Sequence, residues 1–127
     1  MSTRAIIRFA TREEGVSFSE HPEKWHAQLY RHSDGYPEGL GLDIADSLVD
    51  STKIDNLEID SLDTQHGDLD YIYYIWQGYL YTSTWISVFK VVDEAMCDQP
   101  NCGKRLVRKD KCIFVGQPMD LQTKYDH

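Results

Sequence analysis

The chain has 127 residues, of which 41% are hydrophobic and 12% aromatic, so it is long and apolar enough to bury the core of one domain, and global disorder is excluded. No apolar run approaches the ~20 residues that span a membrane, and residues 1–9 lack the apolar centre of a secretory signal. We therefore expect a soluble, cytoplasmic protein with no membrane partner. The odd number of cysteines, three, argues against a closed disulfide framework.

The charge is distributed unevenly along the chain. The net charge is −8, and residues 34–70 carry eleven acids against a single base, whereas residues 97–127 carry six bases against four acids. An acidic surface repels phosphate backbones and attracts basic protein surfaces, so direct binding of nucleic acid is not expected. The alternative is that the acids only keep the surface solvated.

The first third of the chain predicts strands. In residues 3–9 apolar side chains alternate with arginines, which is typical of a strand with two different faces. Residues 16–18 are expected to form a short strand or to continue the hairpin, and residues 25–32 to form a longer strand with the same alternation. A turn rich in Gly and Pro follows, in which we expect Gly35 either to have a positive φ or to lie too close to another backbone for a Cβ.

A helix is expected from Pro37, a first-turn residue, to about Ser51. Apolar residues recur every four positions in this segment and form one stripe, namely Leu40, Ile44 and Leu48. The acids form a separate stripe at spacings of three and four, namely Asp43, Asp46 and Asp50. These three carboxylates are therefore expected to point to solvent together.

The second half of the chain predicts more strands. Residues 57–59 fit either a short strand or an irregular loop. Residues 69–77 predict a central strand that is apolar on both faces, and residues 79–92 one or two strands paired with it. The fold class is thus α+β, with one antiparallel sheet of four or five strands on one main helix. Residues 1–95 form the core domain, and residues 96–127 a basic, Cys-containing appendage with its best strand at 111–116.

Two segments carry a resemblance. An N-terminal strand beginning Ser2-Thr3-Arg4 is followed by Tyr30-x-His32-x-Asp34-Gly35-Tyr36-Pro37-x-Gly39-x-Gly41, and residues 67–74 match more loosely. The chain thereby resembles an uncharacterised family of short phage and prophage proteins, although Ser33 stands where that family has Trp. The resemblance implies an accessory protein that interferes with host machinery, such as CRISPR or nucleotide-signalling defences, by a non-enzymatic route.

We expect the partner-binding residues to be the acids of the helix and of the segment after it: Asp43, Asp46, Asp50, Asp55 and Glu58. Together they would imitate the spacing of phosphates and occupy a basic nucleic-acid groove on a host protein. No catalytic residues are predicted, and a homodimer is compatible with the sequence.

The alternative function is a module that binds a small nucleotide-like ligand or a metal. Its residues would come from the turn and from the aromatic strand: His32, Asp34, Tyr36, Tyr73 and Trp76. A second His-x-Asp pair, His66 and Asp68, could complete a metal site. The plainer interpretation is that the turn residues bond their own backbone and the aromatic side chains pack the core.

The cysteines predict a second metal candidate. Cys97, Cys102 and Cys112 are expected to come close together, and the Cys102-Gly103-Lys104 run is typical of a zinc-binding loop. The spacing of four residues between the first two departs from the usual two, so free thiols or a labile disulfide are the alternatives.

Overall fold

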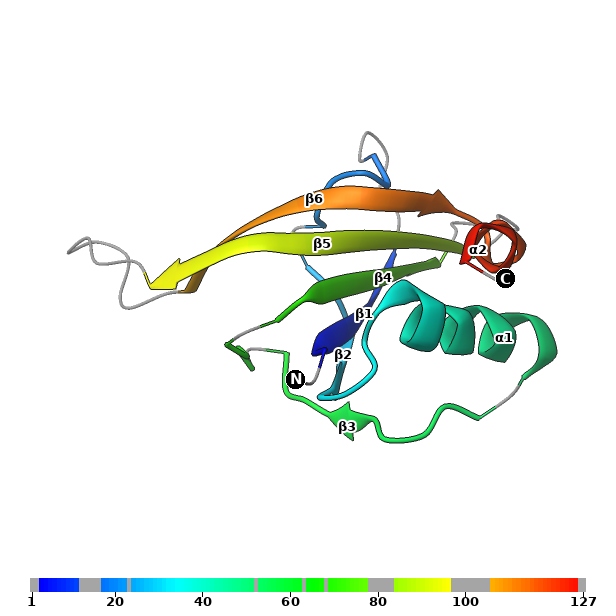
Figure 1. Cartoon of the computed structure of the whole chain (residues 1–127), viewed down its shortest axis with the longest axis horizontal. Coiled ribbons are helices and arrows are strands. Elements are labelled where there is room, and N and C mark those ends of the chain that lie inside the picture. Colours follow the sequence, from blue (N-terminus) through cyan, green and yellow to red (C-terminus); the bar gives the residue numbers. More distant parts are fainter. Residues whose placement is uncertain are drawn as a thin grey trace.

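A computed structural model of the chain describes residues 3–11, 17–22, 24–51, 53–62, 64–67, 69–77, 84–96 and 106–125. Within these residues six strands form one mixed sheet in the order β3-β2-β1-β4-β5-β6, and helices cover one of its faces (Figure 1). The strands are β1 (Ala5–Thr11), β2 (Ala27–Arg31), β3 (Glu58–Ile59), β4 (Tyr71–Gln77), β5 (Trp85–Met96) and β6 (Leu106–Gly116). The helices are the π-helix η1 (Pro37–Gly41), α1 (Leu42–Asp50) and α2 (Pro118–Tyr125). The expected α+β class is confirmed.

The prediction of a purely antiparallel sheet is wrong at its centre. β1 pairs in parallel with β4, from Ala5 opposite Tyr71 to Thr11 opposite Gln77, while the other pairs are antiparallel. The cause is the long connection through β2, η1, α1 and β3, which returns the chain to the side of β1 in the same direction. Such a crossover is what parallel strands require.

The C-terminal segment is part of the sheet rather than an appendage. β6 pairs with β5 along most of its length, and α2, which the sequence analysis did not predict, packs against α1. Leu121 of α2 is fully buried in the core under α1. A helix of eight residues with one core side chain gives too weak a periodic signal to be predicted.

Each face of the sheet has its own core. Toward the helices the core residues include Ile7, Tyr73 and Val88, with Leu40 and Ile44 from the helical segment. On the second face, which is turned away from the helices, they include Ile6, Ile72 and Trp76. β4 is therefore buried on both sides, as its sequence predicts. Of the strand expected at 16–18, Val16 lies outside the described residues, whereas Ser17 and Phe18 lie in a turn segment and Phe18 packs on the second face.

The helix predicted from Pro37 is present in two parts. It begins as η1, continues as α1 and ends at Ser51, which adopts a left-handed conformation with φ 58°. Leu40, Ile44 and Ala45 are buried, whereas Leu48 and Val49 are 40% and 45% exposed. The apolar stripe is therefore covered by the sheet only in its first half.

Gly35→Ala is expected to lower the free energy of unfolding by about 1–3 kcal/mol, because a Cβ at this position would lie 2.8 Å from the Ala5 Cβ and 3.0 Å from the Thr3 carbonyl oxygen. Of the two reasons expected for a glycine at position 35, the structure shows the close approach of another backbone segment and not a positive φ. Gly41→Ala is the control, since its Cβ would meet its nearest neighbour at 3.5 Å. Urea melts should show the loss only for Gly35→Ala; equal stability of the two variants would contradict this account.

Candidate functional site

The turn before η1 uses its polar groups to hold itself together. The amide of Gly35 donates to the carbonyl of Thr3, and the buried Tyr73 hydroxyl donates to the carbonyl of Gly35 at 2.6 Å. Asp34 has a φ of 53°, and its carbonyl accepts from the amide of Leu40. The Tyr36 hydroxyl lies 3.4 Å from a carboxylate oxygen of Asp34. These contacts favour the structural interpretation of the turn.

The five residues of the alternative ligand site do not form one site. Tyr73 contacts the turn from the helix-covered face, whereas Trp76 is buried in the core of the second face. The Trp76 indole donates to the Ser87 hydroxyl, which donates in turn to the carbonyl of Phe18. Trp76 therefore packs the loop that covers the second face instead of meeting the turn.

The two histidines of the His-x-Asp pairs both lie near the ring of Tyr30. His66 stacks on Tyr30 with ring centroids 3.7 Å apart, and His32 lies 6.2 Å from the same ring. They contact different acids, since His66 bonds Asp60 at 2.8 Å and His32 lies 3.9 Å from Glu58. In the part of the chain that is described, no three His, Cys, Asp or Glu side chains are grouped so as to hold a metal ion. Asp68 lies outside the described residues.

Of the three cysteines, only Cys112 belongs to the described residues; Cys97 and Cys102 lie outside them. Cys112 is a free thiol on β6, partly buried against the second face, and burial raises the pKa of its thiol. It stands six residues after Leu106, which is about 20 Å along a strand. The zinc site that joins all three cysteines stays a prediction.

The acids chosen for partner binding have different environments. Asp43 accepts from the largely buried Arg31 at 2.9 Å, which ties the first turn of α1 to β2. Asp46 accepts from the side-chain amide of Gln122 at 2.7 Å, which ties α1 to α2. The other three, Asp50, Asp55 and Glu58, are exposed. The acidic stripe of the helix is thus partly used to hold the fold.

Residues 53–59 lead to β3, one of the two outer strands, at one free edge of the sheet (Figure 1). We call the exposed side chains of Asp50, Asp55 and Glu58 the acidic edge. Exposed apolar side chains accompany it, since Ile59 is 89% exposed and Leu48 and Val49 stand just before Asp50. The lone base of this segment is Lys53, which is also exposed.

The second face carries a polar network that the sequence analysis did not identify. Arg8 of β1 is its centre: Nε donates to the Gln28 side-chain oxygen at 2.8 Å and one terminal nitrogen donates to the Tyr74 hydroxyl at 2.9 Å. The guanidinium also lies 3.7 Å from the ring centroid of Trp25. Arg8 is paired across the sheet with both Gln28 and Tyr74, so the three side chains form one row.

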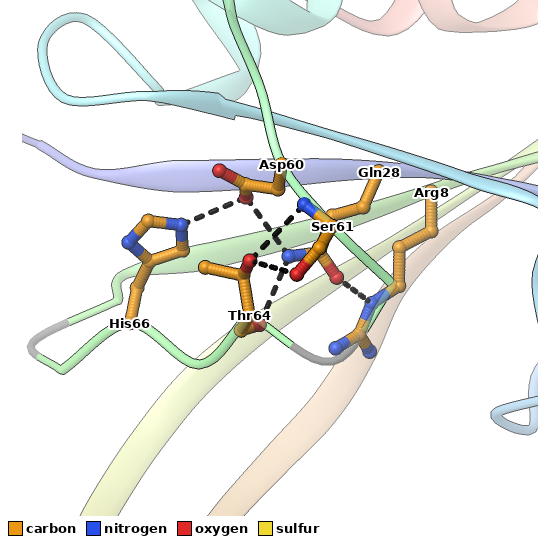
Figure 2. A network of polar contacts seen from close by, with 6 residues as sticks. All are labelled: Arg8, Gln28, Asp60, Ser61, Thr64 and His66. Carbon is orange, nitrogen blue, oxygen red and sulfur yellow. Dashed lines mark hydrogen bonds and ion pairs between the residues drawn. The ribbon is translucent and has the colours of Figure 1, made fainter.

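One arm of the network runs from Gln28 to the loop after β3 (Figure 2). The Gln28 amide, 1% exposed, donates to Asp60 at 2.9 Å and to the carbonyl of Thr64. The same Asp60 oxygen contacts His66 at 2.8 Å, and Ser61 and Thr64 close the loop through their hydroxyls. This arm holds Asp60, Ser61, Thr64 and His66 over the second face.

The other arm runs from Tyr74 to β6. The Tyr74 hydroxyl lies 2.6 Å from Nδ1 of His21, and Nε2 of His21 lies 2.7 Å from Asp110. His21 also stacks on Phe89 of β5 with ring centroids 4.2 Å apart. Because both ring nitrogens are engaged, His21 serves here to hold its loop on the sheet.

One signal in the sequence could have revealed this network. The alternation of β1 and β2 places Arg8 on the same face as Ile6, and Gln28 on the same face as Tyr30. A polar side chain on an otherwise apolar strand face has to be hydrogen-bonded when it is buried. The partners from distant loops, His21 and Asp60, carry no such signal.

No helix among the described residues is long and apolar enough to cross a membrane. Comparison with models of protein families, with curated proteins and with solved structures found no match to this chain.

Tyr74→Phe is expected to lower the free energy of unfolding by about 1–3 kcal/mol, because it deprives Arg8 and His21 of one buried partner. Tyr30→Phe is the matched control, since it removes a hydroxyl from the same face while the ring remains over His66. Urea denaturation of both variants measures the difference. An equal, small effect of the two would show that the network does not stabilise this face.

The phenols near η1 predict a loss of stability in alkali. Burial raises the pKa of Tyr73 well above its ordinary value and raises those of Tyr71 and Tyr125, with a contribution from Glu38 at each. The stability tied to these neutral phenols is complete below pH ~10, where the unfolded chain ionises, and is lost as the pH rises toward the folded pKa values.

The free energy of unfolding should therefore fall above pH ~10, and Tyr73→Phe should make this fall shallower by up to about 1.4 kcal/mol per pH unit. Tyr36→Phe, at a position 38% exposed, is the control. Urea melts between pH ~8 and ~11 measure the slopes. If both variants follow the wild-type slope, the buried phenol of Tyr73 is not the cause.

Proposed function

We propose that the chain is a non-enzymatic binding protein that engages a basic surface of a partner through the acidic edge. The observation that supports this most is the composition of that edge: three exposed carboxylates beside exposed apolar side chains of α1 and β3. Exposed apolar residues flanked by charge are typical of protein interfaces. The net charge of −8 would add electrostatic steering toward a basic partner.

The resemblance to phage proteins would make the partner a host protein, such as a defence protein with a basic nucleic-acid groove, and the chain its inhibitor in the host cytoplasm. Asp43 and Asp46, which hold Arg31 and Gln122, would then contribute charge while keeping α1 in place. The contact itself would depend on Asp50, Asp55 and Glu58. The ligand-binding alternative has less support, because Trp76 and the turn lie on different faces.

The test is capture of host proteins from a lysate on the immobilised chain, compared between Asp50→Lys/Asp55→Lys and the control Glu20→Lys/Asp93→Lys. All four positions are exposed, and both variants change the net charge equally. The control and the wild type should retain the same protein at about 50 mM salt and release it near 1 M, where the Debye length is about 3 Å. The edge variant should retain at least about tenfold less.

A captured protein that is retained equally by both variants would contradict the acidic edge as the binding surface. Retention that does not depend on salt would contradict the electrostatic part of the proposal. Substitution of Asp43 or Asp46 is avoided here, because it would also disturb the position of α1.

A further inference from the structure

A cavity of about 110 Å³ lies between α1, the sheet and the segment that leads to β3. Its walls are apolar apart from Ser47 of α1. The lining residues are Ile7, Phe9, Leu29 and Ile75 from the sheet, Ile44, Ser47 and Leu48 from α1, and Ile54 and Leu57 from the following segment. The cavity therefore lies under the half of α1 that the sheet does not fully cover.

The cavity reaches the surface beside the acidic edge. Leu48 lines it and is 40% exposed. Ile59, which is paired with the lining residue Leu29, is 89% exposed. Apolar surface thus continues from the cavity onto the edge of the sheet, where a partner would contact it.

The exposed residues next to the lining residues in the chain are negative on balance. Asp50, the last residue of α1, stands two positions after the lining residue Leu48, and Asp55 stands directly after the lining residue Ile54. Lys53 is the single base between them. A bound group would therefore meet apolar walls and, beside them, two carboxylates against one ammonium.

We propose that this cavity receives one aliphatic side chain of the partner, carried by a basic segment. This inference rests on the proposed function, and it identifies the partner side chain that would anchor the complex. A cavity of ~150 Å³ admits benzene, so about 110 Å³ suits a side chain of leucine size rather than an indole. Buried anchors of this kind contribute much of the affinity of an interface, while the acids select the positive charge around the anchor.

The test uses two probes with the same isobutyl group and opposite charge: 3-methylbutan-1-amine and 4-methylpentanoate. Their binding is measured from the methyl NMR signals of Ile44, Leu48 and Ile54. The amine is expected to bind at least about threefold more tightly than the carboxylate at low salt, and the ratio should approach one near 1 M salt, where charges are screened.

Two variants locate the binding. Ser47→Phe from α1 and Ile54→Phe from the following segment would each fill the cavity, so either one that folds should abolish the binding of both probes, whereas Ser47→Ala should preserve it. The inference is overturned if the amine leaves the three methyl signals unchanged, if the carboxylate binds as tightly, or if a folded Phe variant still binds the amine.

The two proposals fail separately in these experiments. If the Asp50→Lys/Asp55→Lys variant loses capture of the partner but the amine does not bind, the cavity is not an anchor site, whereas the acidic edge remains the proposed binding surface. If the amine binds but the Asp50→Lys/Asp55→Lys variant captures the partner as well as the wild type does, the cavity remains a cation-selective apolar site and the proposed function is contradicted.

Discussion

The positive charge of Arg8 in the middle of the sheet is the constraint around which the second face is arranged. A guanidinium cannot be deprotonated in a protein, so every buried contact that it makes must be an acceptor or an aromatic face. Gln28, Tyr74 and Trp25 meet that need directly. Their remaining groups then bond Asp60 and His21, which place two loops over the face turned away from the described helices. The loops thus take the role that α1 and α2 have on the other face.

The elements that cover the two faces of the sheet are held by different interactions. This difference affects where the proposed partner would bind. The helix-covered face depends on apolar packing plus a few ties, such as Arg31 to Asp43, and it leaves part of α1 and a cavity open at one edge. The second face has its own apolar core, and directional hydrogen bonds of the polar network hold two loops over that core; a rearrangement would leave these buried polar groups unpaired. A partner that inserts a side chain therefore meets less resistance beside α1 than across the polar network.

The α+β class, the central position of β4 and the helix from Pro37 could be predicted, because periodicity and turn residues report local structure. The parallel pairing of β1 with β4 and the place of β6 in the sheet could not, since strand order depends on contacts between distant segments. The different environments of the helix acids could not be predicted for the same reason. Their spacing places Asp43 and Asp50 on one stripe, but only the fold brings Arg31 into contact with Asp43. The contacts of His21 and Asp60 with the polar network also could not be predicted, because they too depend on the fold.

The parallel pairing of β1 and β4 also affects how the chain acquires its fold. Some sixty residues separate these strands, and both cores are built on their contact. Closing so long a loop lowers the chain entropy before the contacts between the two strands can stabilise the fold. This order of events slows folding. During synthesis the first seventy residues would have β1, β2 and α1 available but no β4 on which to assemble them. The N-terminal half, including Asp50, Asp55 and Glu58, can therefore complete its packing only after β4 has been made.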